Sequence, residues 1–199
     1  MHATFHPRFA MSKQNSTHAL TVAINEKKID PLMIPISTTI SKTHYYFTTS
    51  TCSGRITLMD LNEDESKKEN VFYRKWHRKV KFNEVWEGIE NYEKKGNLWF
   101  RQDPFVYVIG TQDVEHAQLV IRACQEAGVK RYGIHHIEEG KILLEIFGTH
   151  HMGIPIVIKG KMLVEKKNVQ EFVKIANQKW TRNEEKRKKL EKALRKRLE

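Results

Sequence analysis

The sequence is poor in cysteine and has no long apolar run. Among its 199 residues, Cys52 and Cys124 are the two cysteines, and they do not form a Cys-x-x-Cys pair. This usage excludes a disulfide scaffold and a cysteine-based zinc site, and it favours a reducing, cytoplasmic setting. No apolar run approaches the roughly 20 residues that cross a bilayer, and residues 1–10 lack the apolar segment of a secretory signal. We therefore expect no contact with a membrane.

The glycine motifs that bind nucleotides are also missing. Neither a Walker-type loop nor a G-x-G-x-x-G follows any predicted strand, so a Rossmann-type cofactor site has no local support. A phosphatase loop is excluded as well, because Arg55 follows Cys52 too closely along the chain. No sequence motif of these kinds therefore indicates the fold, and the pattern of predicted helices and strands is the remaining guide.

Positive charge is abundant. Lys and Arg number 35 against 24 Asp and Glu, which gives a formal net charge of +11. Such an excess favours polyanions, because bound phosphates release their counterions. Residues 182–199 hold nine basic and four acidic residues. An apolar stripe runs through this segment, so we expect a helix that docks one face and offers a basic face to phosphates. The stripe consists of Leu190, Ala193, Leu194 and Leu198.

The order of the predicted elements indicates an α+β fold with mixed or antiparallel sheets and a few helices. Paired strands alternate irregularly with single helices, unlike the regular alternation of a doubly wound Rossmann-type sheet. Asp113 is expected to cap a helix that ends at Gly128, and Pro35 argues against an uninterrupted helix over 29–40. Strands are expected at 45–49, 55–59, 71–76, 98–101 and 104–109, and hairpins at 129–147 and 154–164.

We expect three parts along the chain. Residues 1–10 form a disordered or spurious N-terminal extension, and Met11 could be the natural start. Residues 11–180 form the α+β domain, within which 104–147 reads as an antiparallel strand-helix-strand-strand element of ferredoxin-like type. Residues 181–199 form the basic C-terminal helix.

The segment 47–55 has the most specific composition. It combines five hydroxyl side chains, a thiol, a glycine and an arginine, and 50–54 reads as a small polar turn between two strands. Gly54 permits close approach of a ligand to the backbone, and Arg55 offers a fork for a carboxylate or a phosphate. The alternative is an ordinary polar turn with one exposed arginine.

The ten histidines include two adjacent pairs, His135-His136 and His150-His151. Neighbours on a strand point to opposite faces, and no acidic ligand spacing accompanies them, so we expect no metal site. His77 is different, because basic and aromatic residues flank it. Lys75, Trp76 and Arg78 could bind RNA by stacking and phosphate contact. The alternative is that Trp76 belongs to the core.

Residues 48–55 resemble the SxSSCSGR signature of the wybutosine-synthesizing methyltransferases, which methylate the N-4 ring nitrogen of a wyosine precursor in tRNA. Five positions match as they stand, and Thr48 and Thr51 replace serines while keeping a hydroxyl. The five matching residues are Ser50, Cys52, Ser53, Gly54 and Arg55. The resemblance extends from about Phe9 to Lys192 and includes 28–30, 75–77 and 98–100. The chain departs from the family pattern at 150–154.

The resemblance implies that the 11–180 domain is catalytic and uses S-adenosyl-L-methionine. The acceptor would be a 7-aminocarboxypropyl-demethylwyosine base at position 37 of phenylalanine tRNA. His77 would act as the general base, since an ordinary histidine pKa of about 6.5 suits that work. Ser53 would assist it at the reacting centre. The residues expected to bind the cofactor are Thr48, Ser50, Thr51, Cys52, Gly54 and Arg55, and those expected to bind tRNA are Lys75, Trp76 and Arg78.

Two other classes of function stay open at this point. One is a tRNA-binding module without chemistry, which would have no reason to bind S-adenosylmethionine. The other is a metal-dependent hydrolase of nucleic acids built on the histidine pairs, although the sequence lacks the carboxylate cluster that such enzymes need. The oligomeric state is also open.

Overall fold

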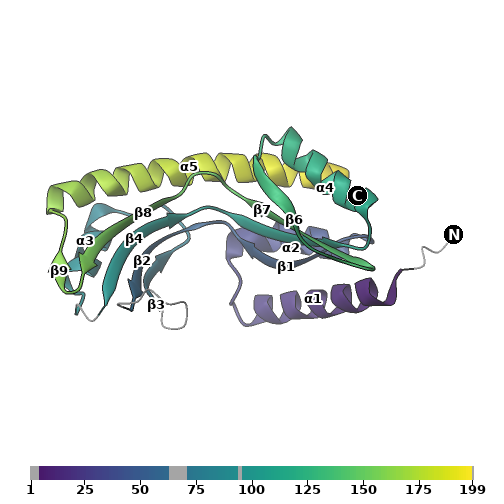
Figure 1. Cartoon of the computed structure of the whole chain (residues 1–199), viewed down its shortest axis with the longest axis horizontal. Coiled ribbons are helices and arrows are strands. Elements are labelled where there is room, and N and C mark those ends of the chain that lie inside the picture. Colours follow the sequence, from purple (N-terminus) through teal and green to yellow (C-terminus); the bar gives the residue numbers. More distant parts are fainter. Residues whose placement is uncertain (1–4, 63–70, 94–95, 199) are drawn as a thin grey trace. The chain divides into compact units, whose positions relative to one another are not determined.

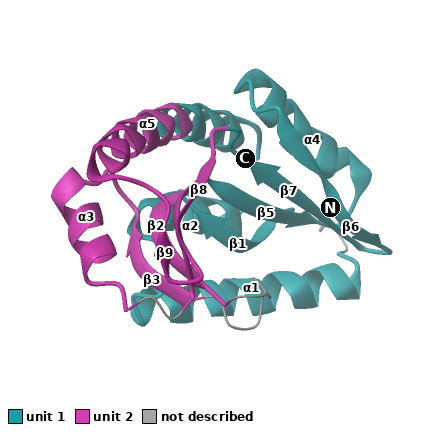
Figure 2. Cartoon of the chain, turned by 60° about the vertical axis from the view of Figure 1, so that its left-hand side comes forward, with its two compact units in different colours: residues 1–53, 105–149, 184–199 teal, residues 54–104, 150–183 magenta. Residues whose placement is uncertain are grey.

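The computed structural model describes residues 5–62, 71–93 and 96–198. The chain forms two compact units, which Figure 2 shows in different colours. The first unit comprises residues 1–53, 105–149 and 184–199, and the second comprises 54–104 and 150–183. Each unit is therefore assembled from separate stretches of the chain. Among the described residues, no helix combines the length and apolar character that crossing a membrane requires.

The first unit contains a four-stranded sheet in the order β1-β5-β7-β6, and each neighbouring pair is antiparallel. β6 and β7 form the predicted hairpin, which turns at Gly140 with a φ of +72° that favours glycine. The antiparallel pairing predicted for 104–147 is confirmed. The strands are β1 (Phe47–Cys52), β5 (Val106–Thr111), β6 (Arg131–Glu138) and β7 (Lys141–Phe147).

Helices lie on both faces of this sheet (Figure 1). Phe9 of α1 packs against Phe47 on one face, and the other face carries the main core. Asp113 caps α4 as predicted, by accepting a hydrogen bond from the His116 backbone. Burial raises the pKa of the Cys124 thiol to about 12, so this cysteine is an inert core residue. The helices are α1 (Pro7–Asn25), η1 (Pro31–Met33), α2 (Ile34–Lys42), α4 (Val114–Glu126) and the end of α5 (Lys166–Arg197).

Two prolines shape the segment between α1 and β1. Pro31 begins the 3-10 helix η1, and Pro35 lies in the first turn of α2, where its missing N–H has no helical partner to lose. The segment is therefore two short helices, and the prediction against an uninterrupted helix is confirmed. Residues 7–10, at the end of the predicted extension, form the first turn of α1, while residues 1–4 lie outside the described residues.

The second unit contains a five-stranded antiparallel sheet in the order β3-β2-β4-β8-β9. One face packs against α3 (Phe82–Glu90) and residues 166–183 of α5, and side chains of all these elements share one core. Ile56, Leu58, Leu98 and Phe100 supply the centre of that core. The strands are β2 (Arg55–Leu61), β3 (Val71–Trp76), β4 (Asn97–Asp103), β8 (Met152–Ile158) and β9 (Lys161–Met162).

Alternation along the strands sends another set of side chains to the opposite face of the second sheet. Register places Arg55 opposite Asp103 and Met59 opposite both Trp99 and Phe72. None of these residues belongs to the core beneath the unit's helices. Because the described helices of this unit pack on the other side of the sheet, we call this surface the helix-free face. It consists of Arg55, Met59, Phe72, Lys75, Trp99, Arg101 and Asp103.

The prediction of an α+β fold with antiparallel sheets and a long C-terminal helix is confirmed. α5 is 32 residues long and contributes to both units. The predicted stripe on this helix is buried in the first unit's core. The described sheets are antiparallel throughout, so the Rossmann alternative is excluded for the described residues.

Candidate functional site

The signature segment is mostly strand. The predicted turn over 50–54 is wrong for residues 50–52, because β1 continues to Cys52 and pairs with Val106 of β5. A register shift between Thr48 and Ser50 marks a bulge, a device that redirects side chains at functional sites. Only Ser53 and Gly54 lie between β1 and β2, and the second unit begins at Gly54.

Two hydroxyls of the signature bind the protein itself. Thr48 is only 6% exposed, and its Oγ1 donates to the carbonyl of Val108 at 2.9 Å. The Thr51 and Ser37 hydroxyl oxygens lie 3.1 Å apart in a hydrogen bond. The Ser50 side chain, in contrast, is exposed. Within the first unit, Thr48 and Thr51 therefore fix the strand, while Ser50 is accessible to a ligand.

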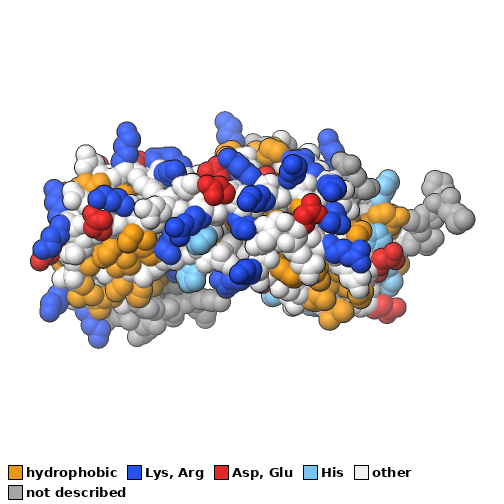
Figure 3. Space-filling view, turned by 90° about the horizontal axis from the view of Figure 1, so that it is seen from above, with side chains coloured by type: hydrophobic (Ala, Val, Ile, Leu, Met, Phe, Trp, Pro, Cys, Tyr) orange, Lys and Arg blue, Asp and Glu red, His pale blue; other side chains and the backbone are white. Residues whose placement is uncertain are grey.

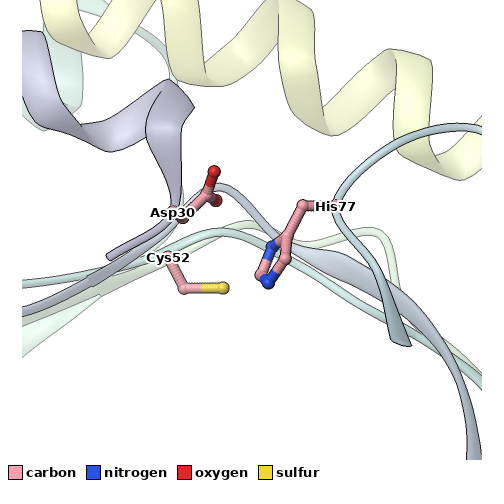
Figure 4. A group of neighbouring side chains, drawn as sticks. All are labelled: Asp30, Cys52 and His77. Atoms are coloured by element: carbon pink, nitrogen blue, oxygen red, sulfur yellow. The ribbon is translucent and has the colours of Figure 1, made fainter. Parts of the chain in front are cut away.

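Asp30 supports the signature, although the sequence analysis assigned it no role. Its carboxylate accepts hydrogen bonds from the backbone N–H of Ser53 and of Leu32, both at 3.0 Å. A carboxylate oxygen also lies within 4.8 Å of the Cys52 sulfur; both side chains are drawn in Figure 4. The available signal was an aspartate directly before Pro31, which is the composition of a helix cap. Asp30 thus caps η1 and holds the Ser53 backbone.

Gly54 and His77 form a defined pair in the second unit. Gly54 has a φ of +99°, which a residue with a side chain rarely adopts, and its carbonyl oxygen lies 2.9 Å from His77 Nδ1. A carbonyl oxygen can only accept, so Nδ1 must carry the proton of this hydrogen bond. In the neutral ring the unprotonated nitrogen is then Nε2. The signature backbone therefore sets the tautomer that a general base requires.

Arg55 is oriented by a carboxylate on the neighbouring strand. Its Nε lies 3.4 Å from Asp103 Oδ2, and its guanidinium stacks 4.6 Å from the centre of the Phe72 ring. Arg101 Nη2 donates to the other oxygen of Asp103 at 3.0 Å. Asp103 therefore orients the guanidinium groups of two arginines on the helix-free face. Neither Arg101 nor Asp103 was predicted as a site residue.

The predicted tRNA-binding trio does not act as one cluster. Trp76 packs against the core on the helix-covered face, and Lys75 lies on the helix-free face with its ammonium 5.7 Å from the Phe72 ring. Arg78 binds Glu84, with the shortest contact at 2.5 Å. Hydrogen bonding to Arg78, together with a backbone hydrogen bond from Lys81, lowers the Glu84 pKa to about 2. The three side chains therefore have different surroundings, and Lys75 is the one of them that lies on the helix-free face.

The second unit has a cavity of about 210 Å³ on the helix-free face. Arg101 and Asp103 line it, so it adjoins the group that holds Arg55. Gly153 pairs with Arg101, which leaves one edge of the Trp99 ring bare of any side chain at that position. The full lining is Leu61, Trp99, Arg101, Asp103, His151, Met152 and Gly153.

The first unit has a larger and shallower hollow along α1, of about 700 Å³. Its charged group is Lys13, whose ammonium donates to the carbonyls of Ser41, Thr43 and Tyr46. Burial lowers the pKa of Lys13. These three carbonyls already use the donors of the ammonium, so Lys13 ties α1 to the end of α2.

The histidine pair of β6 lies on the surface of the first unit. His135 Nδ1 is 3.5 Å from Glu145, and His136 Nε2 is 3.4 Å from Glu138. The two side chains thus have different carboxylate partners, as alternation on a strand predicts. Contacts of this kind between a histidine ring and a carboxylate are ordinary at a protein surface.

The exposed side of α5 is basic (Figure 3). Lys188, Lys189, Lys192 and Lys196 are exposed, whereas Arg187 is buried and pairs with Glu191 at 2.5 Å. Tyr107 donates a hydrogen bond to the same carboxylate. Burial, and to a smaller extent the negative charge of Glu191, raise the pKa of Tyr107 well above its ordinary value. Lys188 pairs with Glu184 at 3.2 Å on the helix surface, and an exposed ammonium on a flexible side chain suits contact with phosphates.

Comparison with known proteins gives one consistent result. The family described as Methyltransferase TYW3 matches residues 10–196. A relative from Thermococcus kodakarensis is named tRNA(Phe) 7-((3-amino-3-carboxypropyl)-4-demethylwyosine(37)-N(4))-methyltransferase 1. It is 31% identical over 188 residues, which cover 94% of each chain. A Danio rerio protein named tRNA wybutosine-synthesizing protein 3 homolog is 33% identical over 144 residues, covering 69% of this chain and 55% of that protein.

Solved structures agree with the sequence comparison. The PH1069 protein of Pyrococcus horikoshii superposes with a TM-score of 0.85 at 31% identity, covering 92% of this chain and 94% of that chain. A protein from Aeropyrum pernix has a TM-score of 0.66 at 20% identity and shares the fold. The similarity therefore includes both units and is not confined to the signature.

Proposed function

The chain belongs to the methyltransferase TYW3 family, and from this premise we propose that it methylates the N-4 ring nitrogen of 7-aminocarboxypropyl-demethylwyosine at position 37 of phenylalanine tRNA. The observation that carries the proposal is the match over residues 10–196 to a family of methyltransferases. The named relatives act on this base, and they give no support to a binding module without chemistry.

The methyl donor in this proposal is S-adenosyl-L-methionine, which supplies an electrophilic methyl carbon on a sulfonium. The signature residues fit such a donor. Arg55 has a guanidinium oriented by Asp103, which suits the carboxylate of the methionine moiety or a tRNA phosphate. Ser50 and Cys52 offer partly accessible polar groups, and Gly54 leaves backbone open to close approach. Thr48 and Thr51 contribute by holding the strand that presents these groups.

His77 is the proposed general base. The acceptor nitrogen forms a bond to the methyl carbon, the carbon–sulfur bond breaks, and the nitrogen must lose its proton. Nε2 of His77 receives that proton, because the Gly54 carbonyl keeps the other proton on Nδ1. Ser53 assists by positioning: Asp30 binds its backbone N–H, and the next residue, Gly54, supplies the carbonyl that orients His77. Positioning of this kind supplies much of the rate in a displacement reaction.

The tRNA backbone is proposed to contact basic residues of both units. Lys75 and the exposed lysines of α5 neutralise phosphates, while Arg78 exchanges Glu84 for a phosphate. Trp76 supports this surface from the core side. Binding that depends on several such contacts weakens steeply as salt is raised.

The direct test combines the purified protein, S-adenosylmethionine labelled in its methyl group, and phenylalanine tRNA carrying the demethylwyosine precursor. We expect label in the tRNA, at N-4 of the modified base when the digested nucleoside is analysed by mass spectrometry. The control substrate is an unmodified tRNA transcript, which should take no label. Absence of label in the modified tRNA would contradict the proposal.

Calorimetric titration with S-adenosylmethionine assigns the donor separately from the acceptor. We expect micromolar binding to the wild type and weaker binding to Ser53→Ala or Arg55→Ala. Asp113→Asn is the matched control, because Asp113 caps α4 and has no proposed contact with the donor. Unchanged binding in both signature variants would contradict the assignment of the donor to this segment.

A further inference from the structure

The helix-free face of the second sheet combines aromatic rings with positive charge. Phe72 is 40% exposed, and Arg55 and Lys75 both lie over its ring. Trp99 is half-buried and borders the 210 Å³ cavity beside Arg101. Arginine, lysine and flat rings arranged along neighbouring strands are the groups that bind single-stranded nucleic acid, because bases stack and phosphates pair with cations.

We propose that the helix-free face binds an unpaired nucleotide of RNA, with the base stacked on Trp99 in the cavity and a phosphate on Arg101. This inference rests on the proposed function only for the class of ligand, since a tRNA loop supplies unpaired nucleotides. Trp99, Arg101 and Gly153 have no part in the proposed donor binding or proton transfer, and this inference gives them a role in binding RNA.

The size of the cavity favours one planar base. Sites for drug-sized ligands measure about 300–1,000 Å³, so 210 Å³ suits a smaller group. Trp99 and Leu61 contribute apolar side chains to the lining of the cavity, and Asp103 and His151 contribute polar ones. A base offers this combination of flat apolar faces and a polar edge.

The charges on this face favour a polyanion. The side chain of Arg101 is 39% exposed and binds Asp103 through Nη2, which orients the guanidinium while the side chain stays accessible. Among the described residues of this face, Arg55, Lys75 and Arg101 outnumber the one carboxylate, that of Asp103. A phosphate therefore meets net positive charge beside the ring that stacks its base.

Gly153 keeps the site accessible. It lies opposite Arg101, and a Cβ at this position would touch the Trp99 ring at 3.9 Å. The first atom would fit without strain, whereas branches beyond it would cover the ring edge. Gly153→Val therefore blocks the site while leaving the charges and Trp99 in place.

The experiment measures binding of a short unstructured oligoribonucleotide to the full chain, by fluorescence anisotropy over a range of salt concentrations. Trp99→Leu is expected to weaken binding about tenfold at every salt concentration, because it removes stacking and no charge. Arg101→Gln is expected to weaken binding and to reduce the salt slope by about 1, because one phosphate contact is lost. Gly153→Val should behave like Trp99→Leu.

Matched variants on α5 locate the contact. Lys189→Gln and Lys192→Gln also remove one charge each, but they lie on the first unit. If these variants reduce the slope while Arg101→Gln leaves it unchanged, and Trp99→Leu binds as the wild type does, the inference is overturned. Thermal unfolding of each variant shows that the fold is retained, and Gly153→Ala provides a smaller change if Gly153→Val does not fold.

Failure of this inference and failure of the proposed function give different results. A chain that methylates the modified tRNA but binds the oligonucleotide independently of Trp99 keeps the function and loses the site. A chain that binds the oligonucleotide through Trp99 and Arg101 but transfers no methyl group keeps the site and loses the function.

Discussion

The two units contribute to the signature in different ways. In the first unit, two hydroxyls and one backbone N–H of the signature bind the protein itself: Thr48 binds Val108, Thr51 binds Ser37, and Asp30 holds the backbone of Ser53. In the second unit, Arg55 and His77 are half-buried, and Asp103 orients Arg55 while the Gly54 carbonyl orients His77. One stretch of eight residues thus contains a structural half and a chemical half.

This difference explains why serine and threonine interchange in the first half. A hydroxyl that donates to a carbonyl of the next strand does the same work on either residue, as Thr48 does. Arg55 has no such substitute, because a lysine lacks the planar fork that Asp103 orients. We therefore expect substitutions of Thr48 and Thr51 to change stability, and substitutions of Arg55 and His77 to change chemistry.

The largest expected effect is on the rate of methyl transfer in His77→Gln. Loss of a general base lowers single-turnover rates by about 10²–10⁴-fold. The free energy of unfolding should change little, because glutamine can still donate to the Gly54 carbonyl. His135→Gln, an exposed histidine of the first unit, is the matched control and should retain the wild-type rate. Full activity of His77→Gln would contradict the role of His77 as general base.

Asp30→Ala should mainly reduce stability. It removes the acceptor for two backbone N–H groups, which we expect to lower the free energy of unfolding by about 2 kcal/mol. Chemical denaturation measures the change. Asp30→Asn retains one oxygen acceptor and should recover part of it. If Asp30→Ala unfolds like the wild type but loses activity, Asp30 belongs to the chemical half instead.

Two buried threonines, one in each unit, should respond differently to the loss of the hydroxyl, with smaller changes in stability than Asp30→Ala. Thr48→Val removes a buried hydrogen bond and should cost about 1 kcal/mol. Thr57 of β2 is also fully buried, but its hydroxyl has no partner among the described residues. Thr57→Val should therefore be neutral or stabilise by up to about 1 kcal/mol. Urea unfolding of both variants checks the contrast, and equal losses would contradict it.

The smallest expected effect is a pH dependence at the start of α3. The folded-state pKa of Glu84, about 2, lies below its ordinary value of 4.5. The ionised carboxylate therefore stabilises the second unit above pH 4.5, and this contribution is lost as the pH falls toward 2. Glu84→Gln should be slightly less stable than the wild type at neutral pH and lose less stability in that acidic window. Unfolding curves at pH 5, 4 and 3 measure the difference.

Local patterns predicted most elements of the fold. Asp113 and the apolar repeat after it define α4, and the turn at Gly140 defines the β6–β7 hairpin. Residues 50–52 were misread, because a run of hydroxyl residues is typical of a turn. Their extended conformation depends on pairing with β5, whose residues lie more than 50 positions away. The division into two units was not predicted, since each unit is assembled from separate segments.

The candidate site divides in the same way. The signature and His77 were found because their spacing is local. Asp103 was missed, because its contact with Arg55 joins residues 48 positions apart and follows from strand register. Arg101 was missed with it, because its place in the site depends on its hydrogen bond to Asp103. Asp30 was missed for the same reason, since its link to Ser53 closes a loop of 23 residues.

Helix α5 has a consequence for how a ribosome releases this chain. Every described strand has been synthesised by Met162, yet both cores still lack side chains that α5 supplies. Trp180 and its neighbours complete one core, and Leu190 and Leu194 complete the other. Each sheet therefore keeps part of its apolar face uncovered until α5 has left the exit tunnel. Neither core is complete before that point, and apolar surface exposed in the meantime favours aggregation.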